Sequence, residues 1–273
     1  MTLQTALLQG TQLLEEASVG VPRLTAEVLL SHAVHCRREY LYAHPEQELR
    51  EVEWIHYGRY LHERMQGKPT QYITRRQEFY GREFHVTPDV LIPRPETEHV
   101  VEAVLKVARG AKRIVDVGTG SGALAVTLQL EMGAAAVATD ISAAAASVAS
   151  DNARRLSAPV DFVVCDLLSA IADRSADAIV SNPPYVPLGT REGLQREVRD
   201  WEPQVALFGG KTGLELYDRI AADAPRVLRP GGWLIMELGF GSVNHVSDLL
   251  AGWRQVHIEP DLAGIPRVIA AHL

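Results

Sequence analysis

Four residues of unusual composition, Asn182, Pro183, Pro184 and Tyr185, lie one residue after the apolar run 176–180, which is typical of a buried strand. The two prolines remove two backbone donors, and proline also restricts the residue before it to extended geometry. Such a segment can simply end a strand. It can equally form a rigid site that binds a planar amide or amine, and the four residues alone favour neither interpretation.

A glycine-rich segment, 118–122, connects a predicted strand at 112–118 to a predicted helix at 121–131. Glycine permits a tight turn and lets a ligand lie directly against the backbone. With Ala123 the segment also satisfies the dinucleotide-binding fingerprint G-x-G-x-x-[GA]. Asp116 argues against a dinucleotide, because a carboxylate two residues before the first glycine is a poor neighbour for a pyrophosphate. It is a good partner for an ammonium or a hydroxyl group.

Acidic residues end three successive predicted strands, at Asp116, Asp140 and Asp166. Asp140 can accept hydrogen bonds from both hydroxyls of a ribose. Asp166 can accept from an adenine amino group, with Leu167 as an apolar contact to the base. Aspartate is also common at strand-to-helix junctions, where it caps the helix. Three such acids together with the glycine segment favour S-adenosylmethionine, which contains a ribose, an adenine, an amino acid and a sulfonium cation.

The Asn182–Tyr185 segment follows the fourth predicted strand and would face that methyl donor, since ligands of open α/β sheets bind beyond the carboxyl ends of the strands. An amide or ring-amino nitrogen is a poor nucleophile, because its lone pair is delocalised. The side-chain oxygen of Asn182 and the carbonyl of Pro183 can accept its two N–H bonds, and Tyr185 can pack on the planar group. We therefore expect catalysis by positioning and desolvation without a strong base, worth up to about 7–11 kcal/mol for ideal orientation.

Alternating strand and helix patterns begin at residue 112 and predict an open, mostly parallel sheet with helices on both faces. The stretch 253–273 predicts two further strands, one of them antiparallel because no helix separates them. Helical patterns alone occupy the chain before residue 75, with helices expected at 25–36, capped by Thr25, and at 45–67. We predict a helical bundle at 1–75 that recognises a protein substrate, a hairpin linker at 76–93 and a catalytic domain at 94–273.

Charge and cysteine content narrow the class of protein. The formal net charge of the 273 residues is −7, which argues against an affinity that depends on neutralising many phosphates, although a local basic patch remains compatible with it. Cys36 and Cys165 lie far apart and indicate reduced thiols. The first 20 residues contain no Lys or Arg, and no apolar run reaches membrane-spanning length, so we expect a cytoplasmic protein. The histidines lack partners at ligand spacing, so we expect no metal site.

The segments 116–122 and 182–185 together resemble the amino-nitrogen methyltransferases of the seven-stranded, Rossmann-like class I type. That class includes DNA adenine, ribosomal RNA guanine and protein glutamine enzymes. Four further stretches resemble one group within it, the release factor glutamine methyltransferases of the HemK or PrmC family: 71–98, 202–220, 228–239 and 261–272. The resemblance implies methyl transfer from S-adenosylmethionine to the side-chain N5 of the glutamine in the Gly-Gly-Gln motif of bacterial peptide chain release factors, with S-adenosylhomocysteine as the product.

When the functional residues of the family are assigned to matching positions of this sequence, the resemblance implies three sets of site residues. The cofactor set is Gly118, Thr119, Gly120, Ser121 and Gly122 for the methionine and ribose, Asp140 for the ribose, Asp166 and Leu167 for the adenine, and Asn182. The substrate set is Asn182, Pro183, Pro184 and Tyr185, of which Asn182, Pro183 and Tyr185 are the catalytic residues. The third set, Arg94, Glu96 and Thr97, matches a segment that borders the active site, although a capped helix start explains these three equally well. Ser242 and Pro266 depart from the family pattern, where a glutamine and an acidic residue are expected.

Other functions stay open on the sequence. A DNA or RNA amino-methyltransferase acting on N6 of adenine or N2 of guanine is the nearest alternative, but it needs a basic face that the charge balance does not visibly supply. An NAD-dependent dehydrogenase explains only the glycine pattern. A non-catalytic binding module with the same fold conflicts with the intact Asn182 and the unbroken glycine segment. We expect a monomer that binds release factors and has no direct affinity for nucleic acid or membrane.

Overall fold

The computed structural model of the chain describes residues 1–261 and 263–273. The described chain divides into two compact units. The first contains Met1–Arg76 together with Gln195–Trp201, and the second contains Gln77–Leu194 and Glu202–Leu273. Each unit has a hydrophobic core of its own, so each is described by itself.

The first unit is helical. Its elements are α1 (Leu3–Glu16), α2 (Pro22–Val34), α3 (Arg38–Ala43), α4 (Glu51–Met65), α5 (Thr70–Thr74) and α9 (Arg196–Trp201). Leucines of α1 and α2 pack with Tyr57 and Leu61 of α4 to form its core. The amphipathic spacing of these leucines is therefore what drives the helices together.

Two helix starts differ from the sequence-based prediction. The helix expected from residue 45 begins at Glu51, because the preceding residues bond to the start of the chain: Leu49 N donates to Met1 O and Leu3 N donates to Gln47 O, both at 2.9 Å. The helix expected from Thr25 begins at Pro22, where proline suits the first turn. Thr25 is buried inside that helix and does not cap it, so both expectations were wrong.

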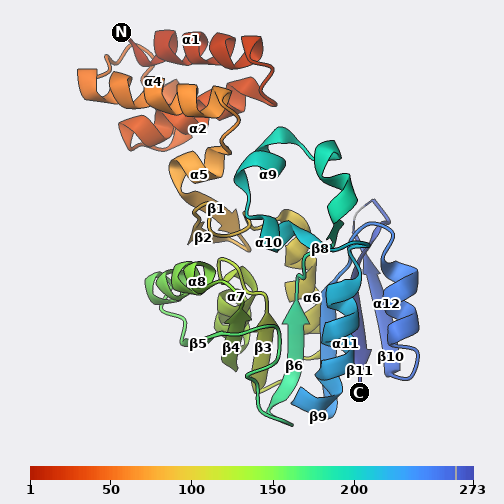
Figure 1. The fold of residues 1–273 in the computed structure, drawn as a ribbon. Helices are drawn as coiled ribbons and strands as arrows, with labels where there is room; N and C mark the ends of the chain where they lie inside the picture. Colours follow the sequence, from red (N-terminus) through yellow and green to blue (C-terminus); the bar gives the residue numbers. More distant parts are fainter. Residues whose placement is uncertain (262) are drawn as a thin grey trace. The chain divides into compact units, whose positions relative to one another are not determined.

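The second unit is built on a seven-stranded sheet (Figure 1). Its strands are β3 (Arg113–Val117), β4 (Ala135–Asp140), β5 (Val160–Val164), β6 (Ala176–Ser181), β9 (Leu228–Glu237), β10 (Arg254–Pro260) and β11 (Pro266–His272). They are ordered β10-β11-β9-β6-β3-β4-β5, and β11 is antiparallel to both neighbours while the remaining pairs are parallel. The predicted α/β fold, with one antiparallel strand near the C-terminal end, is thus confirmed. Leu262, between the last two strands, lies outside the described residues.

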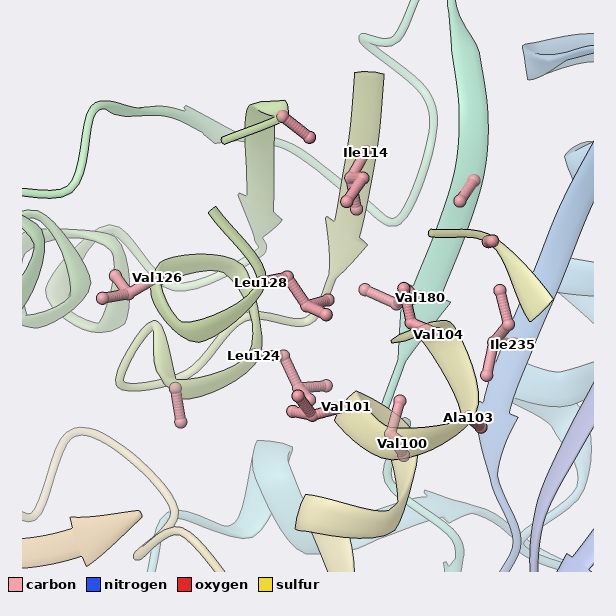
Figure 2. Packing of buried hydrophobic residues seen from close by; sticks show 14 of the residues in the cluster. Val100, Val101, Ala103, Val104, Ile114, Leu124, Val126, Leu128, Val180 and Ile235 are labelled. Atoms are coloured by element: carbon pink, nitrogen blue, oxygen red, sulfur yellow. The ribbon is translucent and has the colours of Figure 1, made fainter. Parts of the chain in front are cut away.

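Helices cover both faces of the sheet. One face carries α6 (Glu98–Val107), α7 (Ala123–Met132) and α8 (Ala143–Arg155), and the other carries α11 (Glu215–Val227) and α12 (Val243–Leu249). Successive strand residues supply the two cores alternately, as Ile114 and Val115 of β3 do. Figure 2 shows the first core, in which Val101 and Val104 of α6 gather with Leu124, Leu128 and Val180.

Short elements complete the second unit. They are the hairpin β1 (Arg76–Phe79) and β2 (Arg82–His85), the 3₁₀ helices η1 (Pro95–Thr97) and η2 (Leu188–Gly193), the strands β7 (Val186–Pro187) and β8 (Phe208–Gly210), and α10 (Gln204–Leu207). Phe79 and Phe84 of the hairpin are buried in the same core as α6 and α7. In the part of the chain described, no helix is long and apolar enough to cross a bilayer.

Candidate active site

The glycine segment after β3 forms a loop whose backbone is partly uncovered. Gly118 and Gly120 have φ values of +72° and +55°, and a Cβ atom at either position would meet no atom within 4 Å. Gly118 N and Thr119 N both donate to Thr139 O at 2.9 Å, which fixes the loop against β4. Gly122 differs, because its Cβ position lies 3.1 Å from the Cβ of Ala149 on α8. The first two glycines therefore leave room for a ligand, and the third permits helix packing.

Ser121 of this loop plays a packing role in the structure. It is buried, and its carbonyl accepts a hydrogen bond of 2.9 Å from Asn152 Nδ2 of α8. The same amide also bonds both backbone groups of His85, so Asn152 ties the glycine loop to the hairpin. Asn152 was not predicted as a site residue, since no local sequence pattern marks a buried polar residue within a helix.

Asp116 lies beneath the loop with one oxygen unused. Its Oδ2 atom accepts from Thr119 Oγ1 at 2.7 Å and from Ala125 N at 3.1 Å. Its Oδ1 atom is buried and has no hydrogen-bond partner among the residues described. Burial raises the pKa of Asp116 to about 7, because the charged form loses hydration. A cationic group bound at Oδ1 would restore the stabilisation that the carboxylate lacks, so this residue fits the ammonium group of an amino acid.

Asp140 is held beside the loop by two backbone donors. Gly120 N donates to Oδ2 and Ser142 N donates to Oδ1, each at 2.9 Å. A carboxylate has about four acceptor sites, so each oxygen keeps capacity for one hydroxyl. Because Asp140 ends β4, this acceptor capacity lies next to the glycine loop.

Asp166 and Leu167 lie just after β5. Cys165 N donates to Asp140 O at 3.0 Å, which holds this segment against the end of β4. Asp166 is exposed and its Oδ2 atom forms an ion pair of 2.6 Å with Arg219 of α11. This partner was not predictable from the residues near Asp166, because Arg219 lies 53 residues away. Leu167 has a positive φ of 50° and is partly buried.

The Asn182–Tyr185 segment begins where β6 ends beside β3. Ser181 pairs with Val117 in the sheet, and its hydroxyl donates to the Val117 carbonyl at 2.8 Å. Asn182 therefore starts at the same sheet edge as the glycine loop. Its Nδ2 atom donates to Thr97 Oγ1 at 2.9 Å, which leaves the Oδ1 atom as the acceptor for a bound molecule. The structure thus connects Asn182 with the first turn of the helical segment at 95–107.

Glycines of a distant segment support the backbone of Asn182–Tyr185. A Cβ atom at Gly209 would overlap the carbonyl oxygen of Pro184, and one at Gly213 would overlap that of Tyr185. The pairing of β7 with β8 brings the two segments together. At Gly239 a Cβ atom would lie 2.6 Å from the ring of Tyr185, so that glycine lets the ring pack on its backbone. Burial raises the pKa of Tyr185 to about 12, which keeps the phenol neutral at physiological pH.

Glu237 ends β9 and is a fourth acid at this edge of the sheet. It is 2% exposed, and its Oε2 atom accepts from Thr97 Oγ1 at 2.6 Å. Burial raises the pKa of Glu237 to about 7, and the hydroxyls of Thr97 and Tyr185 and the charge of Arg267 oppose that rise. Glu237 was not among the acids predicted from the sequence, although its position at the end of a strand follows the same rule as the other three.

Arg94 and Thr97 of the segment 94–97 have different partners. Arg94 forms an ion pair of 2.6 Å with the buried Glu202, and so has a structural partner. Thr97 is 5% exposed and lies between Asn182 and Glu237. No group of three or more His, Cys, Asp or Glu side chains in the described ranges is arranged to hold a metal ion.

Comparisons with known proteins agree with this architecture. Residues 5–74 match the family model described as PrmC N-terminal domain, and residues 97–195 match the methyltransferase small domain. Among solved structures, a methyltransferase from Pyrococcus furiosus is 18% identical with a TM-score of 0.55, covering 71% of this chain and 90% of that one. The hMettl16 catalytic domain is also 18% identical, with a TM-score of 0.57 and coverage of 78% and 81%. At this identity the likeness concerns the fold alone.

Curated relatives are much more similar in sequence. The release factor glutamine methyltransferase of Koribacter versatilis is 47% identical over 98% of both chains. The enzyme of the same name from Nitratidesulfovibrio vulgaris is 43% identical over 99% of this chain and 95% of its own length, and that from Bacillus subtilis is 40% identical over 99% and 97%. The chain therefore belongs to the release factor glutamine methyltransferase family.

Proposed function

We propose that this protein transfers a methyl group from S-adenosylmethionine to the side-chain N5 of the glutamine in the Gly-Gly-Gln motif of bacterial peptide chain release factors. The names of its relatives support the substrate. The main structural support for this chemistry is the position of the Asn182 side chain. Its Nδ2 atom is hydrogen-bonded to Thr97, and the residue lies at the same edge of the sheet as the glycine loop.

The methyl donor would be held by residues after β3, β4 and β5. Asp116 Oδ1 suits its ammonium group, the uncovered backbone of Gly118 and Gly120 suits close contact with its amino-acid part, and Asp140 suits its ribose. We assign Thr119, Ser121 and Gly122 to shaping the loop, and Asp166 with Leu167 to the adenine. When bound, S-adenosylmethionine supplies an electrophilic methyl group on a positively charged sulfur.

The substrate amide would be held by acceptors that cannot rearrange. Asn182 Oδ1 and Pro183 O would each accept one N–H of the glutamine, which aims the nitrogen at the methyl group. The glycines at 209 and 213 pack against the carbonyls of Pro184 and Tyr185 and hold this backbone in place. Tyr185, neutral at working pH, would pack on the planar amide. The residues at this site thus act by orientation and exclusion of water.

The helical unit gives the protein a second surface for recognition. We assign residues 1–75 to binding the release factor and the remainder to catalysis, with 76–93 as the connection. The formal net charge of −7 supports a protein substrate over a nucleic acid. We further propose that the protein acts as a monomer in the cytoplasm.

Transfer of label tests the proposal. The protein is incubated with labelled S-adenosylmethionine and either an unmethylated release factor or the same factor with its Gly-Gly-Gln glutamine changed to alanine. We expect label on the native factor and none on the variant. Label that enters RNA or DNA while both factors stay unlabelled would replace the protein substrate with a nucleic acid.

A further inference from the structure

Three side chains form a continuous hydrogen-bonded chain from the interior to the site. Asn182 Nδ2 donates to Thr97 Oγ1 at 2.9 Å, and Thr97 Oγ1 donates to Glu237 Oε2 at 2.6 Å. Thr97 is 5% exposed and Glu237 is 2% exposed, so solvent does not compete strongly for either bond. The members come from three separate elements, the end of β6, η1 and the end of β9.

The direction of these bonds follows from proton counting. Above its pKa of about 7, Glu237 is mostly ionised and can only accept, so the single hydroxyl proton of Thr97 goes to the carboxylate. Thr97 Oγ1 can then only accept from its other neighbour. Asn182 must therefore turn its NH₂ group toward Thr97, and its oxygen is directed to the opposite side of the amide.

This direction matters because the two ends of an amide are nearly equal in shape. A flipped Asn182 would fill the same space but would present N–H groups where a substrate N–H needs an acceptor. Packing alone does not distinguish the two orientations, whereas the hydrogen-bond chain does. A substrate amide would meet an acceptor in one orientation and a donor in the other.

We propose that Thr97 and Glu237 are positioning residues that fix the side chain of Asn182 with its oxygen toward the substrate amide. The inference rests on the proposed function, since it assigns the orientation of a residue that holds the glutamine. It predicts that Thr97 acts on catalysis only through Asn182.

If Thr97 and Glu237 had a purely structural role, a different result would be expected. Thr97 also joins η1 to β9, so its loss could act by loosening this contact regardless of Asn182. In that case the effects of changing Thr97 and Asn182 would be independent and would combine additively. A double-mutant cycle therefore separates the two roles.

The cycle uses Thr97→Val, which keeps the shape and removes the hydroxyl, in the wild-type and Asn182→Ala backgrounds. We expect Thr97→Val to lower kcat about 10-fold to 100-fold, because Asn182 loses its fixed orientation. In the Asn182→Ala background the same change should alter kcat by no more than about 2-fold. Thr97→Ser should recover most of the wild-type kcat, and the dissociation constant for S-adenosylhomocysteine should stay within about 2-fold of the wild type in the variants that keep Asn182.

Thr127→Val provides a matched control. Thr127 of α7 is also fully buried, and its hydroxyl has no hydrogen-bond partner in the described part of the chain. Its substitution removes a hydroxyl group, as Thr97→Val does, but leaves the hydrogen bonds between Asn182, Thr97 and Glu237 intact. The kcat should therefore remain at the wild-type value. Equal losses from Thr97→Val in both backgrounds, or a wild-type kcat in Thr97→Val, would overturn the inference.

A second readout does not depend on any substrate. The side-chain NH₂ protons of Asn182, observed by ¹⁵N NMR, should exchange slowly with solvent in the wild type and in Thr97→Ser and quickly in Thr97→Val. Rapid exchange in the wild type would contradict the hydrogen bond itself. Failure of the wild type to methylate any release factor would instead contradict the proposed function, and the NMR result would still decide the orientation of Asn182.

Discussion

Four carboxylic acids lie at or just after the ends of β3, β4, β5 and β9, and each has a different environment. Asp116 is buried with one oxygen unpartnered, while Asp140 accepts from two backbone N–H groups. Asp166 pairs with Arg219, and Glu237 accepts from Thr97. The positions of the first three acids were predictable from the spacing of strands. Their partners were not, since a bond such as that from Thr97 to Glu237 joins residues 140 positions apart.

The affinity for the methyl donor should depend on pH through Asp116. The pKa of this buried group is about 7 without ligand, and only its ionised form can pair with an ammonium group. Affinity should thus be full above pH 8 and fall as pH decreases through 7, by about 10-fold at pH 6. Calorimetry with S-adenosylmethionine at pH 6, 7 and 8 measures this dependence.

Asp116→Asn tests the origin of that pH dependence. The substitution keeps the shape and removes the charge, so affinity should decrease at pH 8 by about 10-fold or more. It should also become independent of pH between 6 and 8. Asp151→Asn, on the exposed side of α8, is the control and should bind as the wild type does. An unchanged pH dependence in Asp116→Asn would assign the titration to another group.

Secondary-structure elements were predictable where their pattern is local. The seven strands of the sheet are separated by helical or turn signals in the sequence, and all seven form where expected. The short strands β7 and β8 were missed, because each exists only through pairing with a segment more than 20 residues away. The helix expected from residue 45 was wrong for a similar reason, since residues near Leu49 bond to the start of the chain.

The junction between the end of β9 and the Asn182–Tyr185 segment requires a glycine. Gly239→Ala places a Cβ atom 2.6 Å from the Tyr185 ring, so the ring must shift. We expect kcat/KM for the release factor to fall about 10-fold and the free energy of unfolding to decrease by about 1–3 kcal/mol. Steady-state kinetics and thermal unfolding measure the two effects.

Gly110→Ala is the matched control for this substitution, because a Cβ atom there meets nothing within 4 Å. Both its kinetics and its stability should remain close to those of the wild type. If Gly239→Ala also behaved as the wild type, the close packing of Tyr185 on β9 would not matter for the reaction.

In the molecule as a whole, the division into units does not follow the order of the sequence. Residues 195–201 belong to the helical unit, although the chain on both sides of them belongs to the second unit. Arg64 of α4, which is only 5% exposed, forms an ion pair with Glu197 of this segment. The helix and strand patterns predicted a helical part and an α/β part of the chain. They did not predict that residues 195–201 join the helical unit, because the ion pair that links them to it joins residues 133 positions apart.

Loss of the Arg64 ion pair should weaken recognition of the release factor more than binding of the cofactor. Arg64→Met removes the positive charge that pairs with Glu197 and so attaches residues 195–201 to the helical unit. In the chain, residues 195–201 follow the Asn182–Tyr185 segment and directly precede Glu202. We expect a higher KM for the release factor, by about 5-fold to 10-fold, with cofactor affinity within about 2-fold. Arg59→Met, at an exposed position of the same helix, should leave both unchanged. An equal loss of cofactor affinity would contradict this separation.

Peptide mapping by mass spectrometry is the most direct test of the proposed methylation and of the role of Asn182. A release factor is methylated in a single turnover by the wild type or by Asn182→Ala, digested, and searched for the added methyl group. We expect one methyl on the side chain of the Gly-Gly-Gln glutamine with the wild type, and a rate lower by about 100-fold or more with Asn182→Ala. A methyl group on any other residue, or equal rates for the two proteins, would contradict the proposal.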